Sequence, residues 1–281
     1  MNLSETLIYG NKFLKINNIK TFSLDSELLL SKVLDIRRED LLINLHKRIE
    51  KKKFKKYKKL LNKRKNREPI AYILKKKEFW KLDFYVDQSV LIPRPETEII
   101  VEEVLKFYNY NSSKNFLDIG TGTGCITISI LRERPKCKAT AIDISKNAIN
   151  VAKFNAKMHH LQNKIKFVNI DIDKFSYNKY DFIISNPPYI NIVDLKRLDL
   201  GIKLYEPIIA LQAGIDGLSE IKKIIRKSRT LLKNNGKLIF EIGNKHIEII
   251  MKLLLDNGFY INKICKDIQS NPRVVISTKI F

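Results

Sequence analysis

The hydrophobic pattern divides the chain into a helical beginning and a longer, alternating remainder. Apolar residues recur at helix spacing from Leu3 to about Arg67, and no candidate strand interrupts them. Residues 78–86 alternate as a strand or hairpin does, and Pro95 followed by acids indicates the first turn of a helix. The pattern predicts a helical N-terminal domain over residues 1–77, a connector over 78–93 and a second domain over 94–281.

Strands and helices alternate from residue 115 onward. Helical patterns, including 145–159 and 218–232, separate the first five candidate strands, whereas none separates the last two. We therefore expect an antiparallel hairpin at the sheet's edge and an α/β fold whose parallel sheet is covered on both faces. The candidate strands are 116–119, 139–142, 165–170, 180–185, 237–242, 260–265 and 274–278.

The first of these strands leads through a glycine-rich loop, residues 120–124, into a helix. The G-x-G-x-G spacing differs from the G-x-G-x-x-G of dinucleotide-binding loops, and Asp118 stands just before it. A carboxylate at that place would repel a pyrophosphate, whereas it would hold an ammonium group. For the loop alone, ordinary turn chemistry, in which glycine supplies a positive φ, is the alternative interpretation.

Two further acids follow the next two strands. Asp143 closes the second strand, where a carboxylate can accept both hydroxyls of a ribose. Asp171 ends the third strand and could bond an adenine amino group while Ile172 packs against the ring. A ligand with an ammonium group, a ribose and a base, and no phosphate, is S-adenosyl-L-methionine. The acids therefore predict this cofactor, with S-adenosyl-L-homocysteine as its product.

The fourth strand ends in Asn186-Pro187-Pro188-Tyr189, at the same sheet edge. The prolines cannot donate to a sheet ladder, so they end the strand. The Asn186 side-chain oxygen and the Pro187 carbonyl can each accept one N–H of a planar nitrogen, and Tyr189 can stack on the flat group. We predict methyl transfer to an amide or exocyclic amine, with Asn186, Pro187 and Tyr189 catalytic. A turn without catalytic role is the alternative.

Composition bears on partners and on site classes. The formal charge of +23 would suit nucleic acid, although Lys, Ile and Asn are abundant together, as AT-biased codons produce. Residues 47–67 hold thirteen basic residues on an amphipathic pattern, so their basic face is either solvated or docks on an acidic protein or RNA. The cysteines lack C-x-x-C spacing, and we expect no metal. No signal-peptide or membrane-span pattern occurs, so we expect a cytoplasmic protein.

With these motifs described, the chain resembles the bacterial and organellar release factor glutamine N5-methyltransferases over nearly its whole length. The resemblance implies a Rossmann-like class I S-adenosylmethionine-dependent methyltransferase domain behind a small all-α N-terminal domain, with the substrate held by both. The segments that carry the resemblance are 67–72, 91–98, 118–124, 186–189, 205–207 with 210–211, and 271–275.

The resemblance implies methyl transfer to the side-chain amide nitrogen (N5) of the glutamine in the Gly-Gly-Gln loop of peptide chain release factors, which supports translation termination. Asn186, Pro187, Pro188 and Tyr189 would hold that glutamine. We expect a monomer, and no individual role follows for Arg94, Glu96 or Arg273. The implied cofactor contacts, with Asp118 added from its place before the loop, are Asp118, Gly120, Thr121, Gly122, Thr123, Gly124, Asp143, Asp171, Ile172 and Asn186.

Some features depart from the family or suit other functions. Lys75, Lys81 and Ala213 stand where relatives commonly have glycine, so the backbone is expected to differ wherever that glycine needed a positive φ. The asparagine motif would also suit an adenine-N6 or cytosine-N4 nucleic-acid amino-methyltransferase, although no base-reading domain is apparent. A non-enzymatic RNA-binding module with a vestigial cofactor fold is a third interpretation.

Overall fold

The computed structural model describes residues 1–280, which divide into two compact units. The helical unit comprises Met1–Lys75 together with Asp199–Tyr205, and the sheet unit comprises the rest. The sequence places the first boundary after residue 77 and has no sign that Asp199–Tyr205 belongs with the helices. That segment is connected by a hydrogen bond from the Tyr205 hydroxyl to the Asn66 carbonyl, at 3.0 Å.

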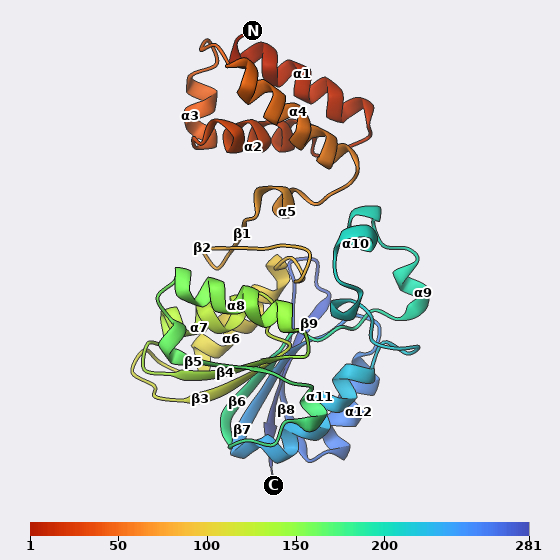
Figure 1. Ribbon diagram of the computed structural model, residues 1–281. Coiled ribbons are helices and arrows are strands. Elements are labelled where there is room, and N and C mark those ends of the chain that lie inside the picture. Colours follow the sequence, from red (N-terminus) through yellow and green to blue (C-terminus); the bar gives the residue numbers. More distant parts are fainter. Residues whose placement is uncertain (281) are drawn as a thin grey trace. The chain divides into compact units, whose positions relative to one another are not determined.

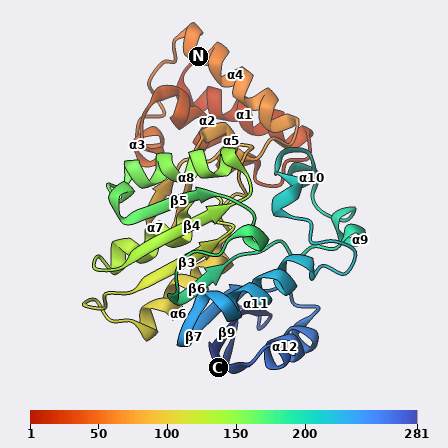
Figure 2. The ribbon, with the colours of Figure 1, turned by 60° about the horizontal axis from the view of Figure 1, so that its bottom comes forward.

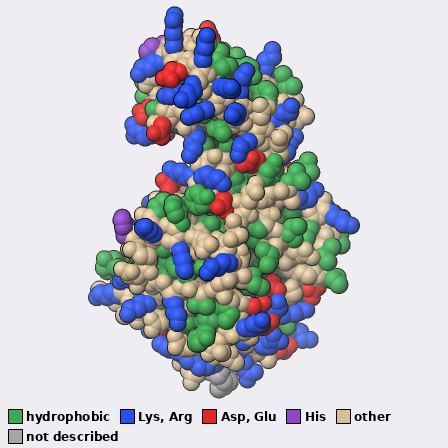
Figure 3. Space-filling model, in the orientation of Figure 1, with side chains coloured by type: hydrophobic (Ala, Val, Ile, Leu, Met, Phe, Trp, Pro, Cys, Tyr) green, Lys and Arg blue, Asp and Glu red, His purple; other side chains and the backbone are tan. Residues whose placement is uncertain are grey.

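Short amphipathic helices around one apolar core form the helical unit (Figure 1). The helices that contribute to this core are α1 (Leu3–Ile16), α2 (Phe22–Leu34), α3 (Arg38–Ile43), α4 (Lys51–Lys65) and α5 (Ile70–Leu74). The unit also contains α10 (Leu200–Tyr205), which lies outside the core. Asn2 and Glu5 form a capping box at the start of α1. In α4, Tyr57 and Leu61 are buried and most lysines are exposed, so the predicted amphipathic pattern is confirmed. Figure 3 shows Lys and Arg on the visible face of both units.

A seven-stranded sheet organises the second unit, in the order β5-β4-β3-β6-β7-β9-β8 (Figures 1 and 2). The first five of these strands run parallel, and β9 pairs antiparallel with both β7 and β8. The predicted edge hairpin is therefore confirmed. The strands are β3 (Asn115–Ile119), β4 (Lys138–Asp143), β5 (Ile165–Asn169), β6 (Tyr180–Ser185), β7 (Leu232–Glu241), β8 (Phe259–Lys266) and β9 (Pro272–Lys279).

Helices cover both faces of this sheet because neighbouring strand residues point to opposite sides. Phe116 belongs to the core shared with α6 (Glu98–Phe107), α7 (Cys125–Glu133) and α8 (Lys146–Met158). Leu117 belongs to the core shared with α11 (Ser219–Leu231) and α12 (Ile247–Asp256). Shorter elements connect them, namely η1 (Pro95–Thr97), η2 (Gln162–Lys164), η3 (Ile172–Lys174), α9 (Ile192–Leu195) and η4 (Ile208–Ala210).

A small hairpin, β1 (Lys77–Phe79) and β2 (Leu82–Phe84), begins the sheet unit. Its two loop residues, Trp80 and Lys81, both have positive φ, at 51° and 56°, as a tight turn of type I′ requires. Lys75 also has a positive φ, 59°, at the end of α5. The expectation of an altered backbone at these two lysines is wrong, because each lysine adopts the left-handed conformation itself. Ala213 is not among the residues with positive φ.

None of the helices within residues 1–280 combines the length and the apolar character needed to cross a membrane.

Candidate active site

A pocket opens in the sheet unit where β3, β4, β5 and β6 end. Parallel strands bring their carboxyl ends to one edge, so polar residues that follow different strands meet there. Of the predicted site residues, the lining contains Gly120, Thr121, Gly122, Thr123, Asp143, Asp171, Ile172, Asn186, Pro187 and Pro188. It does not contain Asp118, Gly124 or Tyr189.

Backbone hydrogen bonds hold the glycine loop against β4. The N–H groups of Gly120 and Thr121 both donate to the Ile142 carbonyl, at 2.9 and 3.0 Å. Gly120 has a φ of 72° and nothing within 4 Å of the place a Cβ would take, so its backbone faces open space. Gly124 lies deeper, where a Cβ would stand 3.3 Å from that of Ala152, so it serves close packing of α7 on α8.

Asp118 supports the loop from beneath. Its Oδ2 accepts hydrogen bonds from the hydroxyls of Thr121 and Thr127, at 2.7 and 2.6 Å. The side chain is buried, which raises its pKa to about 6, and within residues 1–280 its Oδ1 has no partner. Direct contact of Asp118 with a cofactor stays a prediction, because its unpaired oxygen is buried behind the residues that line the pocket.

Asp143 lies at the end of β4 with both oxygens engaged by backbone. Its Oδ2 accepts the Gly122 N–H at 3.0 Å, and its Oδ1 accepts the Ser145 N–H at 2.9 Å. Burial raises the pKa of this carboxyl. Because a carboxylate oxygen has more than one acceptor site, each oxygen can still accept a ligand hydroxyl. The arrangement orients a two-oxygen acceptor toward the pocket, as recognition of a ribose requires.

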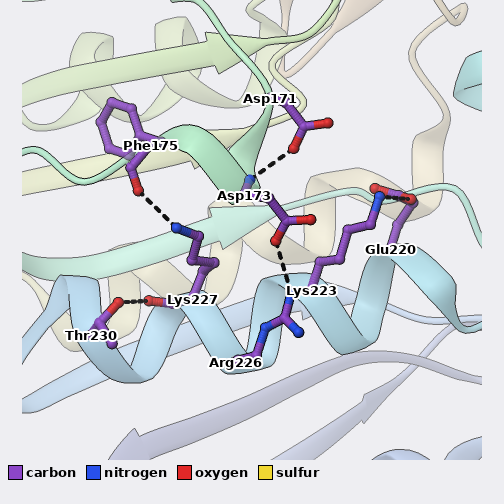
Figure 4. Close-up of polar contacts among 8 residues, drawn as sticks. All are labelled: Asp171, Asp173, Phe175, Glu220, Lys223, Arg226, Lys227 and Thr230. Carbon is purple, nitrogen blue, oxygen red and sulfur yellow. Dashed lines mark hydrogen bonds and ion pairs between the residues drawn. The ribbon is translucent and has the colours of Figure 1, made fainter.

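Asp171 and Ile172 follow β5, and both line the pocket. Figure 4 shows Asp171 with its hydrogen bond to Asp173. One oxygen of Asp171 accepts the Asp173 N–H at 2.7 Å, which begins the turn η3. Lys223, on α11, pairs with Glu220 at 2.8 Å, and both residues line the pocket. Ile172 is buried among apolar residues of the sheet face. This end of the pocket therefore combines an apolar wall with a carboxylate that can accept an amino group.

Asn186 occupies the other end of the pocket, directly after β6. Its side-chain Nδ2 donates to the Thr97 hydroxyl at 2.9 Å. The Thr97 hydroxyl donates to Glu241 Oε2 at 2.6 Å, and the Tyr189 hydroxyl donates to Glu241 Oε1 at 3.2 Å. The Tyr189 ring packs beside Gly243, where a Cβ would stand 3.1 Å from the ring. Stacking of Tyr189 on a substrate amide stays a prediction, and its observed contacts are with Glu241 and Gly243.

Two family models match the chain. The PrmC N-terminal domain matches residues 5–74, and a methyltransferase domain matches residues 110–278. A release factor glutamine methyltransferase of Clostridium acetobutylicum is 37% identical over 282 residues, which cover 99% of each chain. The chain belongs to the release factor glutamine methyltransferase family.

Other relatives of this family differ in length. A bifunctional methyltransferase of Rickettsia bellii is 37% identical over 95% of this chain, which spans only 52% of that protein. Membership of the release factor glutamine methyltransferases confirms the predicted family, the methyltransferase class and S-adenosylmethionine as the cofactor of that class. It does not favour the nucleic-acid methyltransferase alternative.

Solved structures confirm the predicted class I methyltransferase fold. A methyltransferase from Pyrococcus furiosus superposes with a TM-score of 0.54 at 19% identity, covering 81% of this chain and 98% of its own. A ribosomal protein L11 methylase from Lactobacillus delbrueckii subsp. bulgaricus gives a TM-score of 0.51 at 17% identity, covering 67% and 81%. At these identities the likeness establishes the fold alone.

Ion pairs account for family positions to which sequence reasoning assigns no role. Arg94 pairs with the buried Glu206 at 2.7 Å, and Glu206 also accepts the Ile92 N–H at 3.2 Å. This pair fastens the segment before η1 to the one that begins at Glu206, and Arg94 lines the pocket. Arg273 pairs with Asp267 at 2.8 Å within the β8–β9 turn.

Sequence reasoning did not single out Thr97, which lines the pocket, or Glu241, which accepts a hydrogen bond from the Thr97 hydroxyl. Thr97 lies inside segment 91–98, which carries the family resemblance, and this membership could have identified it from the sequence. Glu241 ends β7 and is 2% exposed, and a buried acid at a strand's carboxyl end is the same signal that identified Asp143.

Proposed function

We propose that this chain transfers a methyl group from S-adenosyl-L-methionine to the side-chain amide nitrogen (N5) of the glutamine in the Gly-Gly-Gln loop of peptide chain release factors. The observation that carries the proposal is that Asn186 lines the pocket while its side-chain nitrogen donates a hydrogen bond to the Thr97 hydroxyl. Its Oδ1 and the Pro187 carbonyl are then available to accept the two N–H bonds of a primary amide.

The pocket residues fit the cofactor. Backbone of the glycine loop, Asp143, Asp171 and the apolar Ile172 would hold it, and the unpaired Asp118 Oδ1 would attract its ammonium group. S-adenosylmethionine, when bound, would supply a methyl group on a cationic sulfur that accepts the electron pair of the breaking bond, and the amide nitrogen would release one proton as its bond to the methyl carbon forms.

The chain's own contribution is to position the nucleophile. An amide nitrogen is a poor nucleophile because its lone pair is delocalised into the carbonyl. Asn186 Oδ1 and the Pro187 carbonyl, by accepting both N–H bonds, would fix the amide plane and direct the nitrogen lone pair toward the methyl group of the cofactor. Correct positioning of reacting atoms is worth several powers of ten in rate.

Further parts of the proposal concern partners and location. We propose that the protein acts as a monomer in the cytoplasm, where release factors serve translation. The exposed lysines of α4 support a non-specific contact with RNA through that helix. Docking of the release factor on the helical unit is a part of the same proposal, and the match of residues 5–74 to the PrmC N-terminal domain supports it.

Transfer of labelled methyl from S-adenosylmethionine to a purified release factor tests the proposal. We expect labelling of the intact factor and none when the loop glutamine is replaced by alanine. DNA, RNA and the isolated Gly-Gly-Gln domain serve as parallel substrates. Labelling that persists in the loop-alanine factor, or that reaches only nucleic acid, would refute the proposed activity.

A further inference from the structure

Three side chains form a hydrogen-bonded relay behind the Asn186 carboxamide. Thr97, in η1, accepts from Asn186 Nδ2 and lies between Asn186 and Glu241. Glu241, on β7, accepts from the hydroxyls of both Thr97 and Tyr189. Thr97 and Glu241 are both 2% exposed, so water does not compete for these groups.

The direction of each hydrogen bond follows from counting protons. An ionised carboxylate can only accept hydrogen bonds, so the single hydroxyl proton of Thr97 must be donated to Glu241. The Thr97 oxygen is then an acceptor toward Asn186. The Asn186 group that faces Thr97 must therefore be the NH2, and the carboxamide oxygen must lie on the opposite side. A carboxamide whose two ends look alike is in this way given one orientation.

We propose that Glu241 is a positioning residue which, acting through Thr97, holds the Asn186 carboxamide with its oxygen toward the substrate amide. The inference rests on the proposed function, because it assigns the orientation that acceptance of a glutamine N–H requires. A flipped Asn186 would present its NH2 to the substrate NH2, two donors face to face, and the pocket would reject the amide.

Protonation of Glu241 would undo this orientation. A neutral carboxyl can donate to Thr97, which frees the Thr97 proton to be given to Asn186 Oδ1 and permits the flip. Burial raises the pKa of Glu241 to about 7, with a further increase from Glu96. Arg273, on the neighbouring strand β9, and the hydroxyls of Thr97 and Tyr189 act in the opposite direction. The hydrogen bonds therefore impose this orientation while Glu241 is ionised, and they cease to impose it as the pH falls through the pKa of Glu241.

Variants at Thr97 test the relay without changing any charge. Thr97→Val keeps the side-chain shape and removes the hydroxyl, so we expect kcat for release-factor methylation to fall roughly 10- to 100-fold. Thr97→Ser keeps the hydroxyl and should stay close to wild type. Thr6→Val, which removes a buried hydroxyl in the helical unit, is the matched control and should not change kcat.

The binding of S-adenosylmethionine, measured by calorimetry, separates positioning from general damage to the pocket. Its dissociation constant should be unchanged in Thr97→Val. A Thr97→Val enzyme with wild-type kcat, or a Thr97→Ser enzyme as slow as Thr97→Val, would overturn the inference. So would a loss of cofactor affinity in step with kcat.

A substrate-free measurement addresses Glu241 itself. In enzyme labelled with nitrogen-15, the side-chain amide resonance of Asn186, assigned by its disappearance in Asn186→Asp, should shift with a midpoint near pH 7. The shift should be absent in Glu241→Gln, and a resonance that does not titrate in the wild type would refute the relay. An enzyme that shows this titration yet leaves release factor unlabelled would refute only the proposed function.

Discussion

The glycine loop and the asparagine segment, residues 186–189, meet at one sheet edge but are held by different kinds of contact. The backbone N–H groups of Gly120 and Thr121 bond to the Ile142 carbonyl on the adjacent strand β4, and that of Gly122 bonds to the side chain of Asp143 at the end of the same strand. Asn186, which follows β6, is instead oriented by side chains from two other elements, namely Thr97 in η1 and, through it, Glu241 on β7. The cofactor end, formed by the glycine loop, is therefore held mainly by its own backbone N–H groups against one neighbouring strand. The transfer end, formed by Asn186, is held by side chains that lie much farther away in the sequence.

This difference predicts that substitutions at the cofactor end change the affinity for S-adenosylmethionine, whereas substitutions at the transfer end change kcat. Loss of a carboxylate at the cofactor end should weaken binding of S-adenosylmethionine while leaving the bound complex competent. Loss of a side chain at the transfer end should spare cofactor binding and slow the methyl transfer. Each substitution below is expected to move one quantity and not the other.

The largest effect should come from Asn186→Ala. The variant loses the oxygen that holds one substrate N–H in the transition state, and we expect kcat to fall by about 100- to 1,000-fold with folding preserved. Release-factor methylation at saturating cofactor measures this. Asn163→Ala removes an exposed asparagine in η2 and provides the comparison variant. A fully active Asn186→Ala enzyme would refute the claim that Asn186 positions the substrate amide for methyl transfer.

A smaller effect, of the other kind, is expected from Asp143→Ala. The carboxylate offers charged acceptors to two ligand hydroxyls. Because water can solvate these hydroxyls in the variant, we expect a net loss of roughly 1.5–3 kcal/mol for the pair, so affinity for S-adenosylmethionine should fall about 10- to 100-fold. Calorimetry measures the affinity, and kcat at saturating cofactor should stay near wild type. Asp173→Ala is the control, because Asp173 follows the same edge without lining the pocket. Equal losses in both variants would contradict specific ribose recognition.

The same contrast explains what the sequence could and could not predict. Periodicity located the strands. The glycine loop and its acid Asp143 could be recognised because they belong to two consecutive strands, with Gly122 and Asp143 only 21 positions apart, and repeat a general pattern. The relay could not, because Glu241 and Thr97 are 144 positions apart and only the folded sheet joins them. For the same reason, nothing in the sequence assigned Asp199–Tyr205 to the helical unit.

The smallest expected effect, from Lys81→Gly, asks whether the hairpin before η1 takes part in holding the transfer end. Lys81 is exposed with a φ of 56°, and its neighbour Trp80 donates its N–H to Glu98, next to Thr97, at 2.7 Å. Relief of the left-handed strain, less the entropy cost of glycine, should stabilise the protein by about 0.5–1 kcal/mol.

A rise in thermal midpoint of a few degrees, by calorimetry, would reveal this gain, while Lys77→Gly, in extended strand β1, should lower it. We expect kcat to stay at the wild-type value in Lys81→Gly, because Thr97 is fixed by Glu241 from the sheet and not by the hairpin. If kcat changed as stability rose, the hairpin would have to be counted among the long-range contacts that orient Asn186.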